Sequence, residues 1–244
     1  MTRRETAAEV FDALGARYED LFGRVPEQMA ALDWIAERLP AGARVLDVGS
    51  GTGRPTAEAL AGAGHAVTGI DVSAAMVETA RALVPGARFE QADVRTYVPR
   101  EAGGFDAVCS FFPLLVMDQP EIEAALDRMA SWVAPGGYLV LATVPGDIRG
   151  LDIEWMGHPV TVSSLSVDQH LRRLTEAGLE VLHHHTSTFV PADPRRPGGT
   201  LLLLRDAPTR MTVGRDGAAV WVRASWAGAR GRCATTTRGG RRRP

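Results

Sequence analysis

Short apolar runs alternate with amphipathic stretches along most of the chain. Five of the runs have the length of a strand, and their apolar residues are nearly continuous: residues 43–49, 66–72, 87–94, 105–111 and 138–144. Continuous apolar runs are typical of strands that are covered on both faces of a parallel sheet. The pattern therefore predicts five buried strands.

Amphipathic stretches separate these runs. In residues 73–86, Ser73 is a suitable N-cap, apolar residues recur at helical spacing, and a Pro-Gly pair ends the stretch. Residues 119–137 have Pro120 in the first turn and a Pro-Gly-Gly stop. Strand–helix alternation of this kind favours an α/β fold with a doubly wound, mainly parallel sheet.

Composition and length indicate an ordinary globular protein. The chain has 244 residues, 45% hydrophobic and 23% charged, and its longest apolar run, residues 107–117, is shorter than the roughly 18 residues that span a bilayer. The first residues mix arginines with acidic residues, unlike a signal peptide. The two cysteines have no metal-ligand spacing. We expect a cytoplasmic protein without a membrane partner.

The net charge of −2 hides a change of character near Pro208. Up to that residue, 18 arginines stand against 28 acidic residues, a balance of −10; beyond it, 9 arginines face one acidic residue, a balance of +8. The arginine- and glycine-rich stretch from Thr209 has no sustained strand or helix period. The sequence predicts one folded domain over residues 1–208 and a disordered tail over residues 209–244.

The first predicted strand runs into a glycine turn. In "VLDVGSGTGRP", residues 45–55, Asp47 is followed by Gly49, Gly51 and Gly53. Glycines let a backbone adopt positive φ and approach a ligand closely, and doubly wound sheets bind ligands beyond the carboxyl ends of their strands. The dinucleotide pattern G-x-G-x-x-G is not met, because its third glycine falls on Arg54 or Thr56. A phosphate-binding loop is also excluded, because the chain has no lysine.

This turn resembles the first motif of the class I S-adenosylmethionine-dependent methyltransferases, an acidic residue followed by G-x-G-x-G. Further landmarks of that family follow in "GIDVS", which contains Asp71, in "QADV", which contains Asp93, and in "FDAV" and "APGGYLVL". The resemblance covers about residues 10–205. It implies a seven-stranded sheet whose last strand is antiparallel, with the final pair at residues 179–190 and 199–206.

The resemblance also implies S-adenosylmethionine as cofactor and a set of binding residues. Asp71 would accept hydrogen bonds from both ribose hydroxyls, and Val72 and Met76 would flank the adenine. Asp93 would accept from the adenine amino group, and the backbone amide of Val94 would serve a ring nitrogen. Asp71 and Asp93 each have a structural alternative, as a cap of the helix at Ser73 and as a solvated loop residue.

The methionine end of the cofactor has its own expected contacts. Gly49 and Gly51 would line the methionine portion, with Asp47 near its ammonium group, and Ser110 and Phe111 would lie beside the sulfonium. Asp47 has an alternative role as a cap of its own turn.

Two further segments are expected to cover the site. Residues 1–40 form a helical lid in which Tyr18 resembles a tyrosine that reaches the cofactor carboxylate; core packing is the alternative. Residues 145–165 are an insertion that covers the substrate. The candidate substrate contacts are Phe112, Trp155, Met156 and His158.

Methyl transfer from a sulfonium needs alignment and exclusion of water, and a base only for weakly acidic nucleophiles. His158 is the specific candidate for that catalytic base. The run of histidines at 183–185 predicts no metal site, because alternate residues of a strand point to opposite faces and no carboxylate or cysteine accompanies them.

We therefore expect methyl transfer to an oxygen, nitrogen or carbon atom of a small molecule. A nucleic-acid methyltransferase would have a basic cleft and often an N-P-P-Y-like turn, whereas the domain is acidic and the turn at 110–113 reads S-F-F-P. A non-catalytic S-adenosylmethionine-binding protein is the second alternative. The sequence leaves the substrate and the oligomeric state open.

Overall fold

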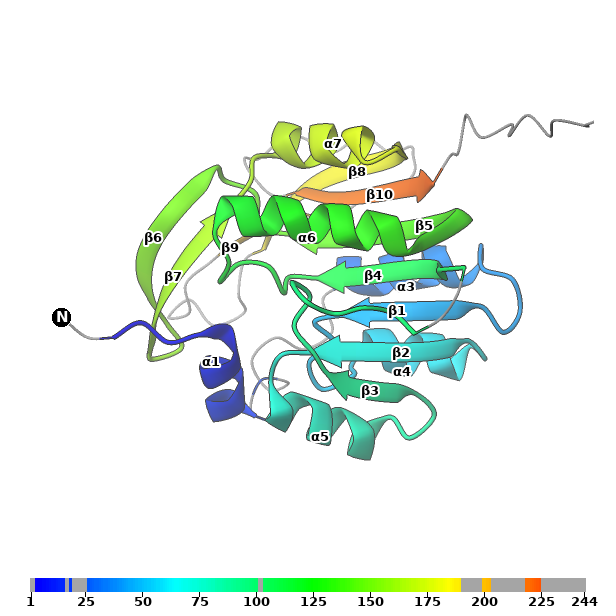
Figure 1. Cartoon of the computed structure of the whole chain (residues 1–244), viewed down its shortest axis with the longest axis horizontal. Helices are drawn as coiled ribbons and strands as arrows, with labels where there is room; N and C mark the ends of the chain where they lie inside the picture. The colour runs from blue at the N-terminus through cyan, green and yellow to red at the C-terminus, as the bar shows by residue number, and fades with distance from the viewer. Residues whose placement is uncertain are drawn as a thin grey trace, which may run out of the picture.

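The computed structural model of the chain describes residues 3–15, 18, 26–100, 103–189, 199–202 and 218–224. Its main sheet has eight strands in the order β3-β2-β1-β4-β5-β10-β8-β9 (Figure 1). The bounds of these strands are β1 Arg44–Val48, β2 Ala66–Asp71, β3 Arg88–Gln91, β4 Phe105–Phe111, β5 Val133–Thr143, β8 Leu179–Phe189, β9 Gly199–Leu202 and β10 Ala218–Ala224.

The five predicted strands are present, and β3, β2, β1, β4 and β5 run parallel. Strand β10 is antiparallel to both β5 and β8, and β9 is antiparallel to β8. The predicted doubly wound, mainly parallel fold is confirmed. Because β1 lies between β2 and β4, the strand order reverses at β1, and its carboxyl end is the place where such sheets bind ligands.

Helices cover both faces of the sheet. In Figure 1, α6 lies in front of the sheet, and α3 and α4 lie behind it. The helices are α1 Ala7–Leu14, α3 Pro26–Ala36, α4 Thr56–Gly62, α5 Ala74–Leu83, α6 Gln119–Trp132 and α7 Val167–Glu176. None of the helices in the described part of the chain is long and apolar enough to cross a membrane.

Local sequence explains where the helices next to the site begin. Ser73 is the N-cap of α5, as predicted, and its side chain accepts a hydrogen bond from the Met76 amide. Asp118 caps α6 in a reciprocal pair with Glu121. The apolar face of α6 then packs on the strands, and the buried Leu126 alone contributes ~1.5–3 kcal/mol relative to exposure.

The predicted tail is wrong for residues 218–224. These residues form β10, which lies between β5 and β8. The expected final pair does form, as β8 and β9, but it lies beyond β10, so the sheet has eight strands and not seven. Local pattern missed β10 because a short strand is stabilised by backbone bonds to partners remote in sequence. The other residues of the predicted tail lie outside the described residues.

The insertion at residues 145–165 is a hairpin beside the sheet. Strands β6 (Ile148–Trp155) and β7 (His158–Ser164) pair across a turn in which Met156 and Gly157 have φ of 57° and 86°. Helix α1 packs on this hairpin, since Val10 and Leu14 are buried in one cluster with Val160. Both α1 and the hairpin lie at the side of the sheet where the arrowheads of β1, β2 and β4 end (Figure 1).

Candidate functional site

The glycine turn after β1 is held against β2. The amides of Gly49 and Ser50 both donate to the carbonyl of Ile70, at 2.8 and 3.0 Å. Gly49, Gly51 and Gly53 have positive φ of 70°, 52° and 82°, a backbone region that favours glycine. The turn therefore depends on its glycines, as the motif predicts.

Gly49 and Gly51 differ in what surrounds them. A Cβ at Gly49 would lie 2.2 Å from the Cβ of Pro113, so the loop after β4 closes directly on this glycine. A Cβ at Gly51 would meet no atom within 4 Å. The turn thus presents bare backbone at Gly51 to an open space, as a ligand cradle requires.

Asp71, at the end of β2, binds the glycine turn and the next helix at once. One carboxylate oxygen accepts the Gly51 amide at 2.8 Å and the other accepts the Ser73 amide at 2.9 Å. Burial raises the pKa of Asp71, while these bonds oppose the rise. Each carboxylate oxygen has a second lone pair, so the predicted capping and ligand-binding roles are compatible.

Four buried polar atoms around the turn have no hydrogen-bond partner within the described part of the chain: Asp47 Oδ2, Ser50 Oγ, Thr52 Oγ1 and Ser110 Oγ. Ser110 is fully buried near the end of β4 and lies opposite Val48 of β1. Unsatisfied buried polar groups are rare in proteins, and a polar ligand is one thing that satisfies them. Together with the cradle at Gly51, they fit the amino-acid end of S-adenosylmethionine.

Asp47 is 2% exposed, and burial, with the negative charge of Asp71 in second place, raises its pKa to about 8. An unfolded chain has a pKa of about 3.8 at this residue. The folded state therefore binds the proton more tightly than the unfolded state does. The protonated Asp47 side chain therefore makes its full contribution to the free energy of unfolding below pH 3.8, and this contribution is lost as the pH rises towards 8.

Asp47→Asn is consequently expected to stabilise the ligand-free protein at pH 8 by at least ~1 kcal/mol, or roughly 2–4 °C in Tm, with little gain at pH 4. Thermal unfolding between pH 4 and pH 9 measures this. Asp93→Asn is the control, because Arg95 lowers the pKa of Asp93 and the substitution should bring no such gain. Parallel pH profiles of wild type and Asp47→Asn would contradict the assignment.

The expected adenine contacts follow β2 and β3. Val72 is half-buried, and Met76 is 1% exposed in the first turn of α5. Asp93 is paired with the Arg95 guanidinium at 2.6 Å. The carbonyl of Val94 accepts a bond from Arg128 at 2.9 Å. These residues lie where the resemblance puts them, and their contacts with adenine stay predictions.

Tyr18 lies close to the site. Burial and the charge of Asp71 raise the pKa of Tyr18 to about 12, and its ring meets Phe11 edge-on with 5.7 Å between centroids. Tyr18 therefore packs in the core near Asp71, and its contact with the cofactor carboxylate stays a prediction.

The substrate-side candidates do not gather at one point. Phe111 is the last residue of β4, and Phe112, which follows it, has φ of 66°. Such a backbone costs ~1–3 kcal/mol and is found mainly at functional sites. Trp155, Met156 and His158 lie instead at the turn of the hairpin.

The three hairpin candidates, Trp155, Met156 and His158, differ in what surrounds them. Trp155 packs on Phe11 of α1, with 5.7 Å between ring centroids, and Met156 is 38% exposed. The Nδ1 atom of His158 lies 2.8 Å from a carboxylate oxygen of Glu5. The sequence did not indicate Glu5, which lies 153 positions away.

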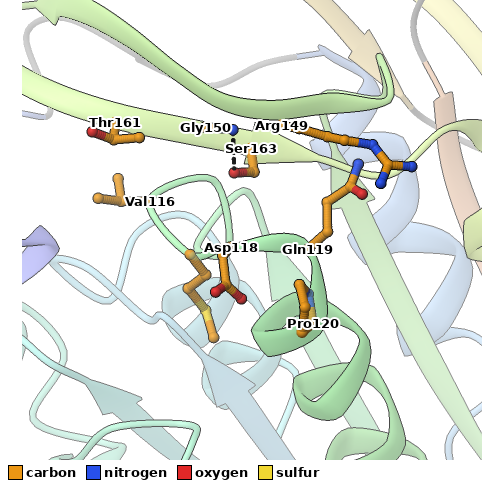
Figure 2. A pocket seen from close by; sticks show the side chains of 9 residues that line it. Val116, Asp118, Gln119, Pro120, Arg149, Gly150, Thr161 and Ser163 are labelled. Atoms are coloured by element: carbon orange, nitrogen blue, oxygen red, sulfur yellow. Dashed lines mark hydrogen bonds between the residues drawn. The ribbon is translucent and has the colours of Figure 1, made fainter.

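Sequence reasoning also missed a cavity of about 320 Å³ between the β4–α6 loop and the base of the hairpin (Figure 2). Gln119 joins the two sides, because its Nε2 donates to the Ser164 carbonyl at 2.8 Å and to Asp147 at 2.9 Å. The cavity is lined by Val116, Met117, Asp118, Gln119, Pro120, Arg149, Gly150, Thr161 and Ser163. The insertion was expected to cover the substrate, but nothing local identified these members of it.

Within the described residues, no three histidine, cysteine or acidic side chains are grouped to hold a metal ion. His183, His184 and His185 are successive residues of β8, opposite Trp221, Val220 and Ala219 of β10. The described geometry therefore supplies a polar cradle at the carboxyl ends of the strands and a separate cavity between the β4–α6 loop and the hairpin, and none of the predicted site residues lines this cavity.

Comparisons with known proteins match this geometry. A family model described as a methyltransferase domain matches residues 45–137. A ubiquinone biosynthesis O-methyltransferase of Xanthomonas axonopodis pv. citri (strain 306) is 34% identical over 198 residues, which cover 78% of this chain and 76% of that protein. A trans-aconitate 2-methyltransferase of Variovorax paradoxus (strain S110) is 36% identical over 131 residues, or 53% of this chain and 48% of that protein. The solved DhpI-SAH complex has a TM-score of 0.56 and 26% identity, and the match covers 83% and 96% of the two chains.

Proposed function

Because the chain belongs to the class I S-adenosylmethionine-dependent methyltransferases, we propose that it transfers a methyl group to a small molecule held between the end of β4 and the β6–β7 hairpin. The predicted enzyme class, the cofactor S-adenosylmethionine and small-molecule methylation are confirmed, and the nucleic-acid alternative is not favoured. The observation that supports the placement of the cofactor, and so of the methyl group, is the set of unsatisfied buried polar atoms around the glycine turn.

The cofactor, when bound, supplies a methyl group that the sulfonium has already activated. Asp71 would accept the ribose hydroxyls, and the bare backbone of Gly51 would admit the methionine portion. An ammonium group beside Asp47 favours the ionised carboxylate and so opposes the effect of burial on its pKa. Ser110 and Phe111, at the end of β4, would border the sulfonium.

The acceptor side is built to orient a substrate and exclude water. Pro113, which follows the strained backbone of Phe112, closes on Gly49, and the hairpin borders the cavity from the other side. Exclusion of water and alignment supply most of what methyl transfer needs. The 34% identity to an O-methyltransferase over most of the chain supports a hydroxyl as the acceptor.

The role of His158 as a catalytic base stays a prediction. Its contact with Glu5 supports it in part, because a carboxylate on one ring nitrogen fixes the ring and leaves the other nitrogen to accept a proton. A cytoplasmic location also stays a prediction.

Asp71→Ala tests the cofactor site. The variant is expected to bind S-adenosylhomocysteine about 1.5–3 kcal/mol more weakly, roughly tenfold to more than a hundredfold, because it loses hydrogen bonds to a charged group. Isothermal titration calorimetry measures this, with NAD as the ligand that should not bind.

Asp106→Ala is the matched control. Asp106 is also a strand carboxylate that accepts a backbone amide, that of Arg44 at 2.7 Å, but it lies at the amino end of β4, away from the site. It should leave the affinity within about threefold of wild type. Equal affinities of Asp71→Ala and wild type would remove Asp71 from the site. Release of S-adenosylhomocysteine over a panel of hydroxylated small molecules then tests turnover and separates an enzyme from a non-catalytic binding protein.

A further inference from the structure

The side chain of Asp12 joins helix α1 to the N-terminal end of α5. An oxygen of the Asp12 carboxylate accepts the hydroxyl of Ser73 at 2.5 Å and the amide of Ala75 at 3.1 Å. Asp12 and Ser73 are 61 positions apart, and Ser73 is fully buried. This contact ties the N-terminal segment to the rim of the cofactor site.

Ser73 connects Asp12 to Asp71. The Ser73 amide donates to Asp71 at 2.9 Å, and the Ser73 hydroxyl accepts from the Met76 amide at 3.1 Å. A hydroxyl has one proton to donate, and here it goes to Asp12. Asp12 therefore sets the orientation of the residue that holds the Asp71 carboxylate.

The two carboxylates also repel each other. The charge of Asp12 is among the causes that raise the pKa of Asp71, after burial. Two ribose hydroxyls that donate to Asp71 would offset this repulsion. Binding of the ribose hydroxyls to Asp71 and hydrogen bonding of Asp12 to the start of α5 should therefore favour each other.

The amino-terminal end of the same segment is fastened to the β6–β7 hairpin. The Glu5 amide donates to the carbonyl of Pro159 at 2.9 Å, and Arg4 pairs with Asp152 at 2.6 Å. The rings of Phe11 and Trp155 also meet. The helix thus spans from the ribose-side carboxylate to the hairpin that lines the acceptor cavity.

We propose that Asp12 is a positioning residue through which cofactor binding fixes α1, and with it the β6–β7 hairpin, over the acceptor cavity. The proposal rests on the proposed role of Asp71 as ribose acceptor. Asp12 itself touches neither cofactor nor substrate; it acts through Ser73 and Asp71.

The first test is the affinity for S-adenosylhomocysteine, measured by calorimetry. Asp12→Ala should weaken binding about tenfold, because it loses the hydrogen bonds that the charged carboxylate accepts from the Ser73 hydroxyl and the Ala75 amide. Asp12→Asn keeps an acceptor of the same shape and should restore affinity to within about threefold of wild type. Glu9→Gln is the control on the same helix, because Glu9 bonds Arg3 and Thr6 and not α5.

Ser73→Ala removes the same hydrogen bond from the other side. The double variant Asp12→Ala/Ser73→Ala should bind less than about threefold more weakly than Ser73→Ala alone, because both changes break the Asp12–Ser73 bond and only the longer bond from the Ala75 amide is lost in addition. The proposal would be overturned if the affinity of the double variant fell by the product of the two single fold-changes. It would also be overturned if a folded Asp12→Ala bound S-adenosylhomocysteine as tightly as wild type does.

The second test is amide hydrogen exchange over residues 148–164. In wild type, saturating S-adenosylhomocysteine should slow exchange in the hairpin, whereas in Asp12→Ala at saturation the hairpin should exchange as in the ligand-free protein. Equal protection of the hairpin in both proteins would overturn the proposal.

The outcome also separates the inference from the proposed function. If Asp71→Ala weakens binding and Asp12→Ala does not, the inference alone fails. If Asp71→Ala binds as wild type does, the ribose assignment itself fails, and the proposal fails with it.

Discussion

A chain truncated after Pro208 is expected to lose its native fold. Strand β10 lies between β5 and β8, and residues 218–223 pair along the length of β5 from Thr143 to Tyr138 (Figure 1). Its removal leaves the edges of β5 and β8 that face β10 without backbone partners and separates β8 from the parallel part of the sheet. A loss of ~5 kcal/mol or more is comparable with the whole stability of a typical domain.

The matched control is truncation after Ala224, which keeps β10 and removes only residues beyond it. This shorter deletion is expected to change stability by less than ~1 kcal/mol and to leave cofactor binding intact. Urea unfolding followed by circular dichroism compares the two chains, and titration with S-adenosylhomocysteine compares their sites. A chain ending at Pro208 with wild-type unfolding would show that β10 contributes nothing to the sheet.

Gly49→Ala is expected to have the second large effect, on stability. A residue other than glycine with φ near 70° costs ~1–2 kcal/mol, and the new Cβ would lie 2.2 Å from Pro113. Because Pro113 cannot move without its neighbours, the two costs together should reach ~3–5 kcal/mol, or roughly 10 °C in Tm.

Gly51→Ala should behave differently. Its φ of 52° brings the same backbone cost, but no atom lies within 4 Å of the new Cβ. The loss of stability should therefore stay near ~1–2 kcal/mol, while affinity for S-adenosylhomocysteine falls at least about tenfold because the methyl group enters the cradle. Thermal unfolding and calorimetry on both variants measure the contrast. Equal losses of stability would mean that Pro113 does not close on Gly49.

Local signals in the sequence determined most of the architecture. The five continuous apolar runs, the N-cap at Ser73 and the Pro-containing start of α6 all depend on neighbours a few residues away, and each was found where it was expected. The glycine turn could also be predicted from the sequence, because positive φ at alternate residues strongly favours glycine there. From these features the fold class, the family and the end of the sheet that carries the site follow.

The tertiary structure alone decided which distant segments meet. The apolar period of a strand says that it is buried but not which strand it pairs with, so β10 was missed although "AAVWVRA" carries valines at alternate positions. The contacts of Asp12 with Ser73, Glu5 with His158 and Gln119 with Ser164 join residues 61, 153 and 45 positions apart. Each is a hydrogen bond between polar residues whose local sequence does not show which distant residue they contact, and only the folded chain brings the two partners within reach.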